Sequence, residues 1–173
     1  VLAGSMAMAM FSGLFSTGFG FFFEPIRQYF GWSRTVLSGA YALSRAESSL
    51  FGPFIGFLIH RFGPRAVMTA AFVAFGLGFL LLSRAGSILT FYLAFLVLAT
   101  GADPPGFIAI MATINNWFRV YRARAIGFAM LGMGLGGVIF PPILAYGFDN
   151  FSWKTVSLAS GVFVLTAGVL ISR

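Results

Sequence analysis

The sequence has no cysteine, one histidine and four acidic residues among 173. The absence of cysteine excludes disulfides, thiolate metal sites and cysteine nucleophiles. One histidine and four acids leave little for a protein metal site or a hydrolytic triad. We therefore expect no metal, no cofactor and no enzymatic chemistry.

Charge of either sign is also scarce, because charged residues make up 9% of the chain, against about 25% in an ordinary soluble domain. Hydrophobic residues make up 59% instead, and a soluble fold of this length could not cover them. The net charge of +7 could suggest nucleic acid as a partner. The basic residues are scattered between apolar blocks and form no basic face, however, so we expect none. Lipid is the natural solvent of this chain.

Apolar blocks of the length needed to cross a bilayer, about 20 residues, recur along the chain. The sequence predicts an all-α membrane protein with six transmembrane helices. They cover Val1 to Phe23, Thr35 to Ile59, Ala66 to Ser83, Ser87 to Phe118, Ala125 to Phe148 and Thr155 to Ser172. We expect Glu24 and Pro25 to end the first helix.

The loops between the blocks differ slightly in charge, which sets orientation in short loops. The loops after the second and fourth blocks hold one more basic residue than the others, and no acid. We therefore expect both termini on the cytoplasmic side of a cell membrane, such as a bacterial inner membrane.

The blocks also repeat, since residues 52–67 align with residues 141–156 and bring Pro53 onto Pro142 and Phe62 onto Phe151. Three crossings per copy force the second copy to be inverted. We expect one six-helix bundle over 1–173, with one repeat over about 1–83 and the other over about 87–173.

Two charges lie deep inside the second block, Arg45 and Glu47. A charge near the bilayer centre costs at least about 2.5–3.5 kcal/mol, so it rarely faces lipid. Tyr41 and Ser49 lie at helical spacing from Arg45, which predicts one polar stripe facing a wet cavity. Glu47 lies about 200° around the helix from Arg45, so it needs a different partner.

A third buried charge, Asp103, lies in the middle of the fourth block and precedes Pro104 and Pro105. Two prolines remove two backbone donors and disturb the helix. Such breaks at membrane depth line a cavity, where water or a ligand satisfies the freed carbonyls.

The loop after the second block carries a family resemblance. Gly56, Arg61, Gly63 and Arg65 match the signature between helices two and three of the major facilitator superfamily, while His60 stands where the family has an aspartate. In the family this signature forms a cytoplasmic latch. A neutral histidine cannot attract the latch cations as a carboxylate does, so the resemblance implies a weakened gating motif.

Two longer segments, residues 21–43 and 114–137, are similar to the bacterial branch of monocarboxylate and oxalate–formate carriers. The resemblance covers the amino-terminal six helices of a twelve-helix fold. It implies a second six-helix half, absent from these residues, or a second copy of this chain. In the family's fold helices one and four line the central path, so it also implies that Arg45 and Asp103 meet across it.

The resemblance and the buried charges together predict a secondary transporter that moves a small organic anion by alternating access with proton coupling. Arg45, with Tyr41 and Ser49, would bind the substrate carboxylate, because a guanidinium offers two parallel hydrogen bonds. Glu47 or Asp103 would carry the proton, because burial favours the protonated carboxyl. The alternatives are a structural ion pair between helices, a non-transporting assembly or receptor subunit, and a half-size carrier acting as a homodimer.

The fifth block is rich in glycine, with Gly132, Gly134, Gly136 and Gly137 in one short run. This run spells a nucleotide-binding fingerprint, but no strand precedes it, so that reading is rejected. It partly resembles the antiporter motif of the same superfamily, with departures that give no support for exchange. We expect these glycines to let a partner helix approach closely.

Overall fold

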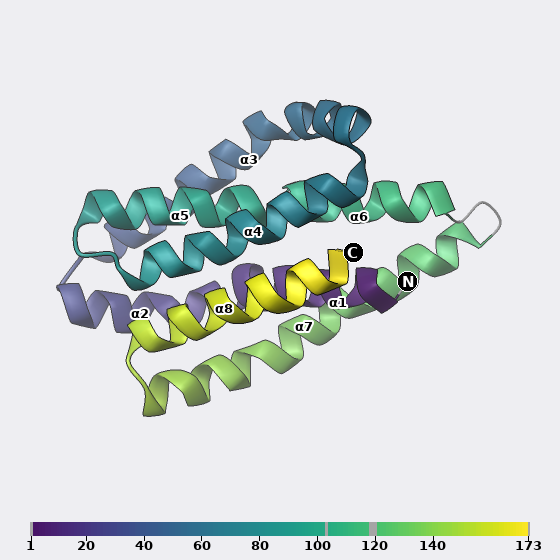
Figure 1. Cartoon of the computed structure of the whole chain (residues 1–173). Coiled ribbons are helices and arrows are strands. Elements are labelled where there is room, and N and C mark those ends of the chain that lie inside the picture. The colour runs from purple at the N-terminus through teal and green to yellow at the C-terminus, as the bar shows by residue number, and fades with distance from the viewer. Residues whose placement is uncertain (1, 103, 118–120, 173) are drawn as a thin grey trace.

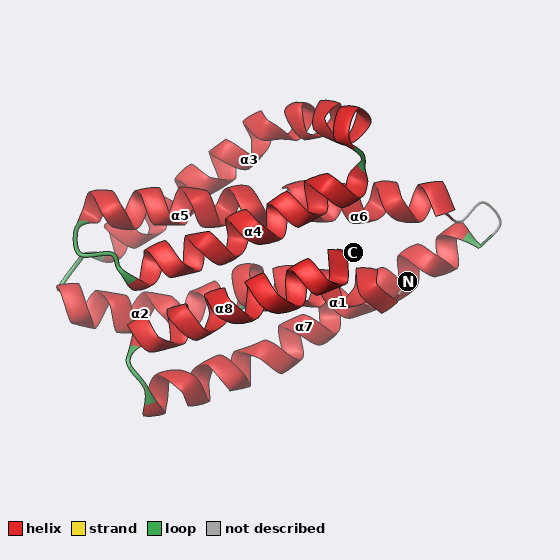
Figure 2. Cartoon of the chain, in the orientation of Figure 1, coloured by secondary structure: helices red, strands yellow, loops and turns green. Residues whose placement is uncertain are grey.

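The computed structural model describes residues 2–102, 104–117 and 121–172, which form helices joined by short connections, with no strand among them (Figure 2). In chain order the segments are α1 Leu2–Phe11, the π-helix η1 Ser12–Thr17, α2 Phe19–Phe30, α3 Arg34–Phe62, α4 Pro64–Ser83, α5 Ile88–Ala102, α6 Pro104–Trp117, α7 Arg122–Asn150 and α8 Trp153–Ser172.

These segments group into six long rods (Figure 1). The segments α1, η1 and α2 follow one another as the first rod, and α5 and α6 together form the fourth. Five rods are long and apolar enough to cross a membrane. The exception is α3, which is 29 residues long but carries Arg34, Arg45, Glu47 and Arg61. The expected all-helical membrane bundle is confirmed.

The connections alternate between the two ends of the bundle. The α2–α3, α4–α5 and α7–α8 turns lie together at one end, which we call the α2–α3 end (Figure 1). The α3–α4 turn lies at the other end of the bundle, which we call the α3–α4 end (Figure 1). The start of α1 and the end of α8 point the same way (Figure 1). The loop charges predict that the α2–α3 end faces outward.

The first rod ends later than the sequence predicts. Pro25 lies inside α2, which continues to Phe30. The helix ends where Gly31 adopts φ 69° and donates its N–H to the Arg27 carbonyl at 2.8 Å. A single internal proline removes one hydrogen bond, whereas a left-handed residue stops the helix. The expectation that Glu24 and Pro25 end this helix was wrong.

The core of the bundle is aromatic and surrounds α4, which packs against α5, α6 and α8. Phe11 of α1 stacks on Phe72 of α4 with ring centroids 4.7 Å apart. Phe19 of α2 contacts Phe95 of α5 at 4.3 Å between centroids. Such pairs add about 0.5–1.5 kcal/mol beyond the area that they bury. The phenylalanines thus tie the first, third and fourth rods together.

Close contact between α7 and α1 depends on two of the four glycines in the α7 run. A Cβ at Gly132 would overlap the backbone of Ser5, and one at Gly136 would overlap the backbone of Ala9. A Cβ at Gly134 would meet nothing within 4 Å. The expected close approach is therefore confirmed for the glycines on the α1-facing side.

Candidate functional site

The central pocket lies beside the middle of α3 and has a volume of about 260 Å³. The first rod, α3, the α5–α6 span and α7 all contribute to its lining. The lining includes Ser12, Phe15, Ser16, Arg45, Phe107 and Met133. Arg45 supplies a permanent positive charge, and the two serines supply hydroxyl groups.

The aromatic ring of Tyr41 supports Arg45 from one turn away on α3. Arg45 Nη2 donates a hydrogen bond to the Tyr41 hydroxyl at 2.6 Å, and its guanidinium carbon lies 5.0 Å from the ring centroid. The ring in turn packs near Phe15 and Phe19, at 6.5 and 6.4 Å between centroids. The first rod thus holds Tyr41, and Tyr41 orients Arg45 toward the pocket.

The π-helix η1 brings the serines to the pocket, and the sequence reasoning missed it. Thr17 Oγ1 donates to the Ser12 carbonyl, five residues back, at 3.1 Å. A π-helical turn is rare and is frequent at functional sites. The available signal was the density of serine, threonine and glycine between Ser12 and Gly18, around Leu14 and Phe15, in an otherwise apolar block. Ser12 and Ser16 therefore join the candidate site.

The structure does not place the predicted site residues Ser49 and Asp103 in the central pocket. Ser49 lies on the same helix as Arg45, but its hydroxyl donates to the Arg45 carbonyl at 3.0 Å, and it does not line the central pocket. Asp103 lies outside the described residues. The expected meeting of Arg45 with Asp103 stays a prediction.

Glu47 faces α5, away from the Tyr41 contact of Arg45. Thr100 of α5 donates a hydrogen bond to Glu47 Oε1, and its hydroxyl also lies 2.8 Å from the Leu96 carbonyl. The other carboxyl oxygen, Oε2, is buried and has no hydrogen-bond partner among the described residues. Glu47 therefore belongs to the α3–α5 interface. Helical spacing predicts a partner other than that of Arg45, but not which helix supplies it.

The residues of the predicted gating motif lie at the α3–α4 end. Gly63 adopts φ 81° between the two helices, donates its N–H to the Ile59 carbonyl at 2.9 Å, and is followed by Pro64 at the start of α4. His60 is exposed. The Arg61 guanidinium lies 5.7 Å from the Phe62 ring centroid. This geometry explains the glycine at 63, since other residues rarely adopt a positive φ.

The other motif residues, Gly56 and Arg65, belong to the ends of α3 and α4. A Cβ at Gly56 would meet nothing within 4 Å, so this glycine allows no close packing among the described residues. Arg65 is exposed in the first turn of α4. The latch role of the motif stays a prediction.

The central pocket has the chemistry of an anion site. A guanidinium presents a planar fork of donors that matches a carboxylate. Hydroxyls of Ser12 and Ser16 can donate to the remaining oxygen lone pairs. The aromatic and thioether side chains of Phe15, Phe107 and Met133 suit a short apolar substituent. The arrangement can therefore bind a small anion with a short apolar substituent.

Comparison with known proteins agrees with this architecture. A sequence model described as "Major Facilitator Superfamily" matches residues 5–173. Monocarboxylate transporter 13 of Rattus norvegicus is 25% identical over 99% of this chain and 40% of its own length. Monocarboxylate transporter 2 of Homo sapiens is 28% identical over 92% and 33%. The oxalate:formate antiporter of Oxalobacter formigenes is 26% identical over 81% and 33%.

The chain spans less than half the length of these relatives. Its six helical rods correspond to half of a major facilitator fold. Together, the multi-spanning apolar helices and the match over nearly the whole chain show that this is an integral membrane protein that belongs to the Major Facilitator Superfamily.

Proposed function

We propose that this chain is the six-helix half of a secondary transporter that moves a small organic anion, such as a monocarboxylate, by alternating access. The observation that carries the proposal is Arg45 in the central pocket, held by Tyr41 and accompanied by serine hydroxyls. The names of the relatives, monocarboxylate transporters and an oxalate:formate antiporter, agree with carboxylate as the substrate class.

Arg45 anchors the carboxylate of the substrate in this proposal. Its Nη2 atom is shared with the Tyr41 hydroxyl at 2.6 Å, which fixes the plane of the fork. The Ser12 and Ser16 hydroxyls complete the contacts, whereas Ser49 lies one turn further along α3, outside the pocket lining. Fixing the fork before substrate arrives reduces the entropy lost on binding.

Glu47 is the proposed proton carrier, with Asp103 as the other acid for this role. The Thr100 hydroxyl has one hydrogen but lies within reach of two acceptors, Glu47 Oε1 and the Leu96 carbonyl. A protonated Glu47 resolves this, because it donates to Thr100 while Thr100 donates to Leu96. Burial of Oε2 without a partner among the described residues also favours the neutral form.

A second six-helix half, or a second copy of this chain, covers α3 and α7 in this proposal. Both helices expose large apolar side chains such as Leu50 and Val138 beside glycines with open space, Gly52 and Gly134. The termini lie on the cytoplasmic side of the cell membrane. The motif from Gly56 to Arg65 then forms the cytoplasmic latch with the covering half.

Transport of labelled acids tests the proposal. The full-length protein is reconstituted in proteoliposomes, and uptake of lactate, pyruvate, formate and oxalate is measured with and without an inward proton gradient. The same assay is run on Arg45→Ala and Arg45→Lys. We expect gradient-stimulated uptake of at least one acid by the parent, and its loss in both variants with folding intact.

Unchanged uptake in Arg45→Ala would leave Arg45 as a structural charge and remove its anchoring role. No uptake of any acid by the parent would favour the competing class, a non-transporting membrane subunit that keeps the fold. Mass spectrometry under denaturing conditions gives the mass of one chain, and light scattering gives the mass of the native particle. A particle of twice the chain mass indicates a homodimer, and a particle of one chain mass indicates a monomer.

A further inference from the structure

The geometry points to a second anion site at the α2–α3 end, in an outer pocket whose cationic groups are Arg27 and Arg34 and whose ligand is a small carboxylate. The outer pocket is the cavity of about 480 Å³ between α2 and α3. Its lining includes Glu24, Arg27, Arg34, Thr35 and Ser38. The inference rests on the proposed function, because that function supplies the carboxylate.

Arg34 is the group that gives the outer pocket its unbalanced charge. Its side chain is exposed and makes no hydrogen bond or ion pair with any described residue. It lies in the first turn of α3, next to Thr35, where the backbone N–H groups at the helix start also favour negative charge. An exposed guanidinium that shares a pocket with a hydroxyl can bind an anion.

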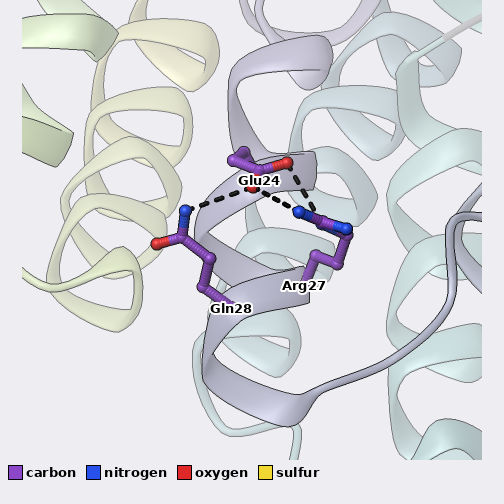
Figure 3. Close-up of polar contacts among 3 residues, drawn as sticks. All are labelled: Glu24, Arg27 and Gln28. Carbon is purple, nitrogen blue, oxygen red and sulfur yellow. Dashed lines mark hydrogen bonds and ion pairs between the residues drawn. The ribbon is translucent and has the colours of Figure 1, made fainter.

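Arg27 is already occupied by a carboxylate, that of Glu24, as Figure 3 shows. Its Nη2 lies 2.8 Å from Glu24 Oε1 and its Nε lies 3.2 Å from Oε2, so the contact is two-pronged. Gln28 Nε2 donates to the same Oε1 at 3.1 Å. Because Glu24 is 49% exposed, an arriving carboxylate can replace it on Arg27. Glu24 therefore lowers the affinity of the pocket and keeps the site reversible.

The outer pocket and the central pocket lie along the same seam between the first rod and α3. On the first rod, Ser16 of the central pocket and Gly20 of the outer pocket are one turn apart. On α3, Ser38, Tyr41 and Arg45 follow at helical spacing. Arg34 and Arg45 are separated by roughly 16 Å along the helix axis. Eleven residues are close to three full turns, so Arg34 and Arg45 lie on the same side of α3.

The outer pocket would serve to recruit anions from solution to the central pocket. A positive group at the mouth of a path raises the local concentration of anions and their rate of arrival. The effect weakens at high ionic strength, since the Debye length is about 8 Å at physiological salt. The outer pocket therefore lowers the concentration of acid needed for half-maximal uptake but leaves the maximal rate to the central pocket.

A cysteine reporter measures the charge of the outer pocket directly. Ser38→Cys is introduced in the full-length protein with any other cysteine replaced, and Ser87→Cys on the α4–α5 turn serves as the reference. The rates of modification by an anionic and a cationic methanethiosulfonate reagent are compared. We expect the anionic-to-cationic rate ratio at Ser38→Cys to exceed the reference by roughly threefold or more.

Three substitutions in the Ser38→Cys background test which charges set this rate ratio. Arg34→Gln should lower the anionic-to-cationic rate ratio to that of the reference, and Glu24→Gln should raise the ratio further. Arg84 is exposed at the same end of the bundle, so Arg84→Gln should leave the ratio unchanged. An unchanged ratio in Arg34→Gln would overturn the site.

Protection by substrate separates this inference from the proposed function. Millimolar lactate or pyruvate should slow modification of Ser38→Cys by neutral N-ethylmaleimide, and Arg34→Gln should abolish this slowing. Slowing without any uptake in proteoliposomes would support the site and contradict the transport function. The opposite result would overturn the outer site but not the transport function. In that case Arg34→Gln takes up acid with an unchanged half-saturating concentration, and acid does not slow modification of Ser38→Cys when Arg34 is present.

Discussion

Helices α3 and α4 follow one another in the chain, but their surroundings differ. Phe72, Phe75 and Phe79 of α4 are fully buried against neighbouring helices. Leu50 of α3 is 79% exposed, and Phe54 is 59% exposed. Both helices are long and contain apolar stretches. Apolar character alone therefore does not distinguish a core helix from one that meets another partner.

Charge divides the same two helices more clearly. The only charged residue within α4 is Arg65, in its first turn. Within α3, Arg34 and Arg45 line the two pockets described above, and Glu47 reaches α5. We infer that α4 holds the bundle together, whereas α3 carries the chemistry. Substitutions in α4 should change stability, and those in α3 should change transport.

The largest expected effect is at Arg45. Arg45→Ala should reduce uptake at least roughly 100-fold, and Arg45→Lys roughly 10- to 100-fold, because a lysine offers no planar fork. The melting temperature in detergent should stay close to that of the parent. Initial uptake rates in proteoliposomes measure the first effect, and Arg84→Lys, at the exposed α4–α5 turn, is the matched control. A fall in melting temperature that parallels the loss of uptake would assign Arg45 a structural role.

The second-largest effect is expected on the stability of the bundle, from a substitution in α4. A Cβ at Gly78 would overlap the backbone of Leu98 in α5, so Gly78→Ala should cost about 1–3 kcal/mol. Thermal unfolding in detergent should show a clear fall in melting temperature. Gly86→Ala is the control, because a Cβ there would meet nothing within 4 Å. Equal melting temperatures for the two variants would show that α4 and α5 are less tightly packed than described.

A smaller effect is expected at Glu47. Gln imitates the protonated carboxyl but cannot release a proton. Glu47→Gln should therefore abolish stimulation of uptake by the proton gradient and change uptake without a gradient by less than about twofold. Uptake at several imposed gradients measures this. Full stimulation in Glu47→Gln would transfer the proton role to Asp103, whose replacement by asparagine is the companion variant.

The smallest effect concerns the hydroxyl beside Glu47. Thr100→Val removes a neutral hydrogen bond, which is worth about 0.5–1.5 kcal/mol, and should lower gradient-stimulated uptake by roughly 2- to 10-fold. Thr113→Val is the control, since that hydroxyl donates to the Ala109 carbonyl of its own helix at 2.8 Å. The same assay is used for both. Identical losses in the two variants would show that the Thr100 contact has no special role.

Much of the fold could be predicted from the sequence, because most of the rods are blocks of apolar residues between short polar turns. The end of the first helix could not, since the effect of Pro25 depends on whether the backbone continues to hydrogen-bond around it. The helix ends instead at Gly31, whose positive φ is a stronger stop. The glycine run on α7 was only partly predictable. Composition does not say that Gly132 faces α1 while Gly134 has open space.

The candidate site was predictable only in part. Helical spacing placed Arg45 with Tyr41, and placed Glu47 on another side of α3, as the contacts show. The serines of η1 were missed, because a π-helical turn shifts the helical register and no spacing rule predicts it. The charge of the outer pocket was missed as well. It depends on Glu24 pairing with Arg27 and leaving Arg34 unpaired among the described residues.

Equilibrium binding of labelled lactate, pyruvate, formate and oxalate to the purified full-length protein tests the central claim most directly. The claim is that Arg45 in the central pocket anchors a carboxylate. We predict measurable binding of at least one acid by the parent and by Arg84→Ala. We also predict a dissociation constant raised at least roughly tenfold in Arg45→Ala, which equals about 1.4 kcal/mol of binding free energy. Equal dissociation constants in the parent and in Arg45→Ala would contradict the account.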